Sequence, residues 1–377
     1  MSEITLSELQ FLELYKSGIW NRKPDSAFPF SDNVIDWDSI FQLAEQQTVS
    51  GILTDGMILL PKEHQPSRAS YMSAVVNTSN IEDDNKKMNA LLPKLFNLMH
   101  GGGVKPWLLK GQGVALNYVH PLHRQNGDVD IYFPDILDYG RASRYFQAHI
   151  RDNYICDEKN MHDEFEIDGI AIELHGHIDG MINHTTHKNI DTWIHNTTKR
   201  YPARTWHTET GVIVIPPVNF DALFIFIHLA RHYFSSCVGL RQITDWMLYL
   251  NNVWEEIDIQ QLLNDINFLG LKKIWSVFST MAVDWLGYPK EKALLYNENY
   301  SSKARQILRF ILDSGNFGYH DERIKSESDN FLINRGTAFK GHLQMILRNF
   351  CIFPEESLFC IPSFIKDGIQ SAGERAK

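Results

Sequence analysis

The chain has few cysteines, and their spacing argues against two common kinds of site. The four cysteines are Cys156, Cys237, Cys351 and Cys360, and no two of them form a Cys-x-x-Cys motif. Cysteines so widely separated favour reduced thiols over a disulfide framework or a cysteine-based zinc site. The sequence therefore predicts a cytoplasmic protein.

Long apolar runs are also missing. No stretch approaches about 18 apolar residues, the length that a transmembrane helix requires. Residues 1–5 carry neither a basic region nor an apolar stretch, so a secretory signal is not expected. We expect no membrane partner for this protein.

Basic residues are outnumbered by acidic ones. The 36 Lys and Arg residues against 46 Asp and Glu residues give a formal net charge of −10 at pH 7. This balance argues against non-specific binding to a nucleic-acid backbone. The rest of the composition, 44% hydrophobic and 22% charged, is typical of a folded globular protein, and 377 residues suffice for two domains.

The apolar pattern divides the chain into three parts. Residues 1–100 show helical periodicity and predict an N-terminal helical portion. Residues 101–216 mix strand-like runs with helices and predict a sheet domain. After Pro216-Pro217 the residues 217–377 predict a helical C-terminal domain. The predicted fold class is α/β (α+β), a mixed sheet with flanking N-terminal helices and a helical C-terminal domain.

Individual elements follow from the same patterns. Helices are predicted at residues 5–20, 38–60 (as one or two helices), 77–99, 136–149 and 190–198. Strands are predicted at residues 104–109, 128–133, 154–156, 164–175 (as a hairpin) and 211–215. The C-terminal part predicts helices at residues 221–234, 240–253, 257–267, 272–286, 301–312 and 339–349.

Two carboxylates on one short strand are the most informative feature. Residues 127–133 read Gly-Asp-Val-Asp-Ile-Tyr-Phe, and strand side chains alternate between faces, so Asp128 and Asp130 point the same way. Neighbouring like charges repel, whereas a hard cation such as Mg²⁺ or Mn²⁺ takes oxygen ligands. The strand therefore predicts a metal site at Asp128 and Asp130.

A third carboxylate lies on a later strand. Asp168-Gly169 between alternating apolar runs predicts a hairpin. On its second strand Glu173 shares the polar face with His175 and His177. We expect this strand beside the Asp-x-Asp strand, with Glu173 as a third metal ligand or base and His175 contributing to the metal or nucleotide site.

A glycine-containing turn precedes the Asp-x-Asp strand. Residues 110–113 read Lys-Gly-Gln-Gly between an apolar strand and a helical run. Glycines let the backbone approach a phosphate, and a helix N-terminus offers free N–H groups, so Lys110, Gly111 and Gly113 are predicted phosphate contacts. Arg124 is placed with them, although it could instead pair with a nearby acid.

Histidines raise a rival interpretation. The residues concerned are His162, His175, His177, His184 and His187. His-x-His motifs occur in zinc and iron sites, so a histidine-based metal-dependent hydrolase is an alternative. It leaves the Asp-x-Asp strand and the glycine turn unexplained.

Two pairs spaced four residues apart occur on the predicted C-terminal helices. His228 and His232 share one helix face, which either lines the acceptor or base side of a cleft or packs in the core. Arg241 and Asp245 could form a surface ion pair of little energetic weight.

Taken together, these motifs resemble a known family. The Lys-Gly turn at 110–111, the Arg-x-x-Gly-Asp-Val-Asp run at 124–130 and the Ile-Glu-Leu-His run at 172–175 are similar to an uncharacterised bacterial nucleotidyltransferase-like family of the polymerase β nucleotidyltransferase superfamily. The superfamily turn is usually Gly-Ser or Gly-Gly, so the turn here departs from it.

The resemblance implies a polymerase β-type sheet and Mg²⁺-dependent transfer of a nucleoside monophosphate, such as that of ATP, from an NTP to an acceptor. It leaves open the base, the acceptor and the oligomeric state. A non-catalytic nucleotide- or partner-binding protein on the same fold is a further alternative.

Overall fold

The computed structural model describes residues 3–25, 29–30, 34–150, 152–316 and 346–359. Its helices are α1 (Leu6–Trp20), α2 (Trp37–Gln46), α3 (Ser50–Ile58), α4 (Arg68–Gly101), α5 (Gly111–Ala115), α6 (Ile136–His149), α7 (His184–Arg200), α8 (Val218–Ser235), α9 (Leu240–Asn252), α10 (Ile259–Phe268), α11 (Lys272–Leu286) and α12 (Ser301–Ser314). Short 3-10 turns are η1 (Lys62–His64), η2 (Pro121–His123), η3 (Trp254–Glu256), η4 (Lys290–Lys292) and η5 (Glu298–Tyr300). Further helical segments cover residues 346–350 and 354–359. The helix expected at 339–349 coincides with the first of these over residues 346–349, and its earlier part lies outside the described residues.

The strands form two sheets. They are β1 (Trp107–Leu109), β2 (Val129–Tyr132), β3 (Ile155–Asp157), β4 (His162–Ile167), β5 (Ile170–His175), β6 (Arg204–His207) and β7 (Val212–Ile215). The five-stranded sheet has the order β1-β2-β5-β4-β3, and β6 pairs with β7. In the larger sheet β2 and β5 are parallel and the other neighbours are antiparallel. The chain is therefore α+β with a mixed sheet, as the sequence predicts, although β6 was not expected.

One face of the five-stranded sheet is apolar. Val129, Ile131, Ile172 and Leu174 are at most 2% exposed and share a core with α4, α6 and β7. Their neighbours along each strand must point to the opposite face because strand side chains alternate. This alternation places the polar side chains of β2 and β5 on the face toward α8.

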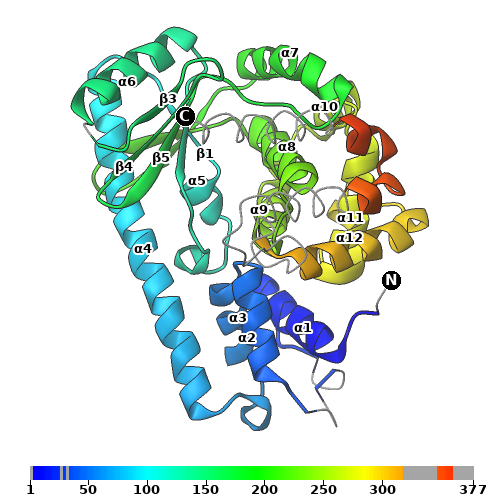
Figure 1. Cartoon of the computed structure of the whole chain (residues 1–377). Coiled ribbons are helices and arrows are strands. Elements are labelled where there is room, and N and C mark those ends of the chain that lie inside the picture. The colour runs from blue at the N-terminus through cyan, green and yellow to red at the C-terminus, as the bar shows by residue number, and fades with distance from the viewer. Residues whose placement is uncertain (1–2, 26–28, 31–33, 151, 317–345, 360–377) are drawn as a thin grey trace, which may run out of the picture.

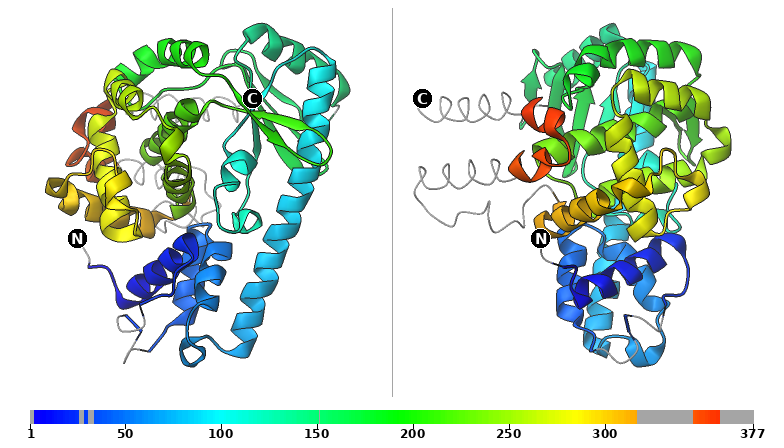
Figure 2. Two further views of the ribbon diagram at one scale, coloured as in Figure 1. Left: turned by 180° about the vertical axis from the view of Figure 1, so that it is seen from behind. Right: turned by 90° about the vertical axis from the view of Figure 1, so that its right-hand side faces the viewer.

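Helix α4 extends along one side of the molecule. Figure 1 shows it running from the sheet at one end to α1, α2 and α3 at the other, and both views in Figure 2 agree. It has 34 residues, so at about 1.5 Å per residue it spans roughly 50 Å. The helix predicted at 77–99 is thus longer than its apolar pattern indicates, because its first turns after Ser67 are mostly solvent-exposed.

Close glycine contacts let α1 and α3 cross tightly. A Cβ on Gly18 would lie 2.0 Å from the Ile52 carbonyl oxygen, and one on Gly56 would lie 1.9 Å from the Leu14 carbonyl oxygen. No larger side chain fits at either contact, so the two helices pack backbone to backbone.

The C-terminal helices build the largest part of the core. Helices α8, α9, α11 and α12 bury aromatic side chains such as Phe226, Tyr233 and Trp275. Phe220 at the start of α8 also packs edge-on against Trp107 of β1, with ring centroids 5.6 Å apart. This contact holds α8 across the polar face of the sheet. In the part of the chain that the structure describes, no helix is both long and apolar enough to cross a membrane.

Candidate active site

Parallel pairing of β2 and β5 brings three carboxylates together. Asp130 lies directly opposite Glu173 in the register, which confirms the expected neighbouring strands. Carboxylate oxygens of Asp128, Asp130 and Glu173 lie within 4.8 Å of one another. This separation suits oxygen ligands around one or two hard cations, so the donor set fits Mg²⁺ or Mn²⁺.

Asp130 is the best compensated of the three acids. Its side chain is 2% exposed, and its Oδ1 lies 2.9 Å from Lys110 Nζ and 2.9 Å from His175 Nε2. Burial alone would raise the pKa of Asp130, but the Lys110 charge and the His175 hydrogen bond lower it. Asp130 is thus held as a carboxylate, and Lys110 lies inside the site.

Asp128 carries the uncompensated charge of the group. Repulsion from Asp130 and burial raise its pKa to about 6. Asp128 is therefore the one acid of the three whose charge the surrounding side chains do not balance. A bound cation would relieve the repulsion, which is a physical reason for this face to bind one.

Two histidines contact Glu173. His162 Nε2 lies 3.2 Å and His175 Nε2 lies 3.3 Å from Glu173 Oε2, and the two rings stack with centroids 4.8 Å apart. Burial would raise the pKa of Glu173, yet the hydrogen bonds from His162 and His175 lower it well below the usual range. Burial would lower the pKa of His175, but its hydrogen bonds to Asp130 and Glu173 raise it.

The other histidines of the rival set lie elsewhere. His177 Nε2 faces Asp191 Oδ1 at 3.3 Å, and His184 and His187 are exposed at the start of α7. Among the described residues, the clusters of three potential metal ligands include His162 and His175 but none of these three.

Helix α8 closes the site opposite the sheet. Lys110 Nζ lies 3.4 Å from both ring nitrogens of His228. Burial, with the neighbouring Lys110 charge second, lowers the pKa of His228 well below its usual value. Burial and the neighbouring Arg231 lower the pKa of His232 to about 3. The shared face predicted for His228 and His232 is therefore a face of neutral imidazoles, with ring centroids 4.3 Å apart, of which His228 contacts Lys110 and His232 lies near Ser236.

Arg124 is engaged by a carboxylate from α9. Its Nε and Nη2 each donate to Asp245 at 2.8 Å, and Tyr118 donates to Asp245 Oδ1 at 2.6 Å. The Arg124 and Asp245 side chains are 6% and 9% exposed. Of the two alternatives for Arg124, the structure shows the ion pair with Asp245; phosphate contact stays a prediction.

The expected Arg241–Asp245 surface pair is wrong. Arg241 Nη1 instead donates to the carbonyl oxygens of Gln125 and Asn126, each at 3.0 Å. Both side chains of the pair are turned toward the loop that leads into β2. Helix α9 therefore fixes the backbone immediately before Asp128.

Helix α4 fixes the same loop from the other side. Asn85 Nδ2 donates to the carbonyl oxygens of Leu122 and Arg124 at 2.7 and 2.8 Å. Gln112 Nε2 donates to Asn85 Oδ1 at 3.1 Å and to Asn89 Oδ1 at 2.8 Å. One asparagine thus links the turn at 110–113 to the loop before Asp128. Nothing in its sequence neighbourhood signals this role.

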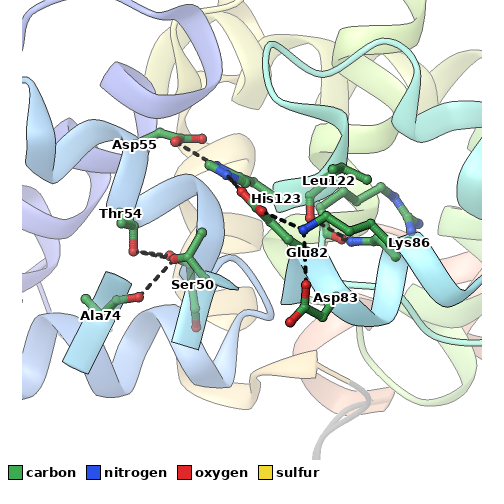
Figure 3. Close-up of polar contacts among 12 residues, drawn as sticks. Ser50, Thr54, Asp55, Ala74, Glu82, Asp83, Lys86, Leu122 and His123 are labelled. Atoms are coloured by element: carbon green, nitrogen blue, oxygen red, sulfur yellow. Dashed lines mark hydrogen bonds and ion pairs between the residues drawn. The ribbon is translucent and has the colours of Figure 1, made fainter. Parts of the chain in front are cut away.

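A third anchor joins the loop to the N-terminal helices. Figure 3 shows His123 of η2 between Asp55 of α3 and Glu82 of α4. Its Nδ1 lies 2.8 Å from Asp55 Oδ1 and its Nε2 lies 2.9 Å from Glu82 Oε1. The hydrogen bond to Asp55, with Glu82 adding to it, raises the pKa of His123 against its partial burial.

The two glycines of the turn have different surroundings. Lys110 and Gly111 have positive φ angles of 48° and 43°, and a Cβ on Gly111 would lie 3.6 Å from the Asp128 carbonyl oxygen. Gly113 faces apolar side chains, since its Cβ would lie 3.5 Å from Ile215. Gly111 therefore borders the acid strand, while Gly113 packs toward β7; phosphate contact stays a prediction for both.

Comparison with known proteins identifies one family. No curated protein and no solved structure matches the chain. A family model described as an uncharacterised nucleotidyltransferase matches residues 33–287. That range is more than half of the chain and contains the turn, the three carboxylates and the loop anchors. The chain therefore belongs to this family of uncharacterised nucleotidyltransferases.

Proposed function

We propose that the protein transfers a nucleoside monophosphate from an NTP to an acceptor in a reaction that depends on Mg²⁺ or Mn²⁺. The observation that carries this proposal is the group of three carboxylates on β2 and β5, whose oxygens lie within 4.8 Å of one another. Membership of a nucleotidyltransferase family supports the same chemistry.

Asp128, Asp130 and Glu173 would hold the metal. When bound, such an ion neutralises charge on the triphosphate and on the departing pyrophosphate. Lys110, 2.9 Å from Asp130, is positioned to move between this carboxylate and a phosphate. The N–H groups of Gly111 and Gly113 are the backbone donors that we assign to phosphate.

The α8 face is the proposed side of the acceptor or the base. His228 lies against Lys110 at 3.4 Å, and burial keeps its imidazole neutral. A neutral imidazole accepts as well as donates hydrogen bonds, so it can contact a hydroxyl without adding charge. In this proposal, residues 101–216 supply the metal and phosphate groups, and residues 217–377 supply this face.

The direct test is incubation with labelled NTPs, Mg²⁺ and a cell extract, with each base labelled in turn. We expect label in a new product, pyrophosphate release and loss of both in Asp128→Asn. Asp168→Asn is the matched control, since Asp168 is an exposed turn residue whose φ of 52° asparagine tolerates. Equal labelling by wild type and Asp128→Asn would refute the proposal.

The same experiment separates the alternatives. A hydrolase would release the label to solvent with no labelled acceptor. A non-catalytic binding protein would bind NTP without turnover. Of the five histidines of the hydrolase interpretation, His162 and His175 contact Glu173, and the other three do not. Glu173 also belongs to the group with Asp128 and Asp130. Within the described part of the chain, the histidines therefore form no separate site of five ligands, which favours the transferase.

A further inference from the structure

A second group of metal-binding side chains adjoins the three carboxylates. Ligand atoms of His162, Glu173 and His175 lie within 4.8 Å of one another, and Glu173 belongs to both groups. The side chains are 28%, 25% and 20% exposed. An ion and its water can therefore reach them.

The distances around Glu173 match metal coordination. His162 Nε2 and His175 Nε2 lie 3.2 and 3.3 Å from Glu173 Oε2. Ligands held at about 2.0 Å from a tetrahedral ion are roughly 3.3 Å apart. The ligand atoms of the two histidines lie within 4.8 Å of each other, and His175 Nε2 must exchange its 2.9 Å contact with Asp130 Oδ1 for the ion.

The sheet makes this group rigid. His162 of β4 is directly opposite His175 of β5 in the antiparallel register, and Glu164 is directly opposite Glu173. His162 Nδ1 also lies 3.5 Å from Glu164 Oε1. A carboxylate behind the second ring nitrogen is the arrangement that orients a metal-binding histidine.

We propose that His162, Glu173 and His175 form a site for a transition-metal ion, such as Zn²⁺ or Co²⁺, next to the site for the hard cation. Imidazole ligands favour these ions over Mg²⁺, whereas the carboxylates of Asp128 and Asp130 favour Mg²⁺. Glu173 bridges the two positions. This inference deepens the proposed function by giving the centre two different metals.

Binding of the second ion needs a defined tautomer of each histidine. Each imidazole must present an Nε2 without a proton to the ion. In His162 the proton then lies on Nδ1, which faces Glu164 Oε1 at 3.5 Å. The remaining positions on the ion are left to water or to the substrate, since the chain supplies three ligands.

The test uses metal-free full-length protein without nucleotide. Co²⁺ binding is followed by its visible absorption, and Zn²⁺ and Mg²⁺ binding by calorimetry. We expect His162→Gln to weaken Co²⁺ and Zn²⁺ binding by at least about tenfold, the lower bound for losing a supporting residue, and to change Mg²⁺ binding much less, because glutamine can still donate a hydrogen bond to Glu173. Asp128→Asn should show the opposite pattern.

His177→Gln is the matched control, because this histidine pairs with Asp191 outside the cluster. It should bind all three ions like wild type. Equal Co²⁺ affinity in wild type and His162→Gln would overturn the proposal. So would a parallel loss of Mg²⁺ and Co²⁺ binding, because the histidines would then only support the acids.

A second variant protects the test against misfolding. Glu164→Gln keeps all three ligands and should lower Co²⁺ affinity severalfold. Its circular dichroism spectrum should be unchanged. An unchanged Co²⁺ affinity would contradict the role of Glu164 behind the second ring nitrogen of His162. The outcome is separable from the proposed function, since labelled transfer with Mg²⁺ is measured independently. Selective Co²⁺ binding without transfer would refute the transferase alone.

Discussion

Asp245→Asn tests whether the buried ion pair with Arg124 supports both the fold and the site. Asp245 accepts two hydrogen bonds from Arg124 and one from Tyr118, and its side chain is 9% exposed. Asparagine keeps the shape, but it presents one acceptor oxygen and removes the charge. The guanidinium then stays buried and unpaired.

The expected loss is large for one substitution. Hydrogen bonds to charged groups contribute about 1.5–3 kcal/mol each, and removing one partner of a buried pair costs about 3–5 kcal/mol. We expect the free energy of unfolding to fall by about 3–5 kcal/mol, measured by urea denaturation. Asp84→Asn is the control, because the Lys87–Asp84 pair is 68% and 56% exposed and such pairs contribute about 1 kcal/mol or less.

The functional result follows from the same geometry. Arg124 lies in the loop that leads to Asp128, so loosening its anchor should also lower NTP turnover under conditions where Asp245→Asn remains folded. A triple variant, Arg124→Met with Asp245→Leu and Tyr118→Phe, should recover much of the stability, since it also removes the hydroxyl that donates to Asp245 and apolar replacement of a whole buried pair is often near neutral. A loss below about 1 kcal/mol in Asp245→Asn, an ordinary value for any substitution, would refute the reasoning.

Three further predictions concern other contacts. In metal-free buffer Asp128→Asn should hold or raise the melting temperature, because it relieves repulsion from Asp130, whereas Asp130→Asn should lower the melting temperature, because Lys110 and His175 lose their partner. Equal shifts in the two variants would contradict the charge assignment. Both variants should lose Mg²⁺ binding in calorimetry. Because the pKa of His123 is raised in the folded state, its protonated form stabilises the fold. This contribution is complete below 6.5, the pKa of histidine in the unfolded chain, and is lost as the pH rises through the pKa of the folded state. Urea unfolding of His123→Gln at several pH values should therefore lack this component, and an unchanged pH profile would argue against the bridge in Figure 3. Gly18→Ala should lower the free energy of unfolding in urea by about 3 kcal/mol or more, since its Cβ would lie 2.0 Å from the Ile52 carbonyl oxygen. Gly101→Ala is the control: its Cβ would have no atom within 4 Å, so this variant should stay within about 1 kcal/mol of wild type. Similar losses in the two variants would refute the close crossing of α1 and α3.

The sequence predicted those parts of the site that depend on local patterns. Alternation along two short strands was enough to put Asp128 and Asp130 on one face and Glu173 beside them. Alternation alone did not place His162 beside Glu173 and His175, because its position opposite His175 depends on the hairpin register rather than on its own neighbours in the sequence. The two-residue turn at Asp168-Gly169 fixes that register, with Ile167 opposite Ile170. Counting back from the turn would have predicted the His162–His175 pair.

Contacts across long sequence separations were not predictable. Arg124 pairs with a carboxylate 121 residues away, and its two alternatives could not be separated without the fold. The spacing of Arg241 and Asp245 on one helix suggested a pair with each other, but burial turned both toward the loop. Asn85 gave no signal, because the sequence does not distinguish this buried asparagine from the exposed polar residues around it on α4.

The anchors of the loop before Asp128 also set an order in time. The Arg241 contact to Gln125 spans 116 residues, and chains grow at about 5–20 residues per second. During synthesis the loop is thus complete roughly 6–23 s before the residue that fixes it exists. Until α9 has been made, the loop before Asp128 has its side-chain anchors to α3 and α4 but not those to α9, and β2 follows directly after this loop. The nascent chain therefore passes through a stage in which the sheet can form and the metal-binding geometry is still unfinished.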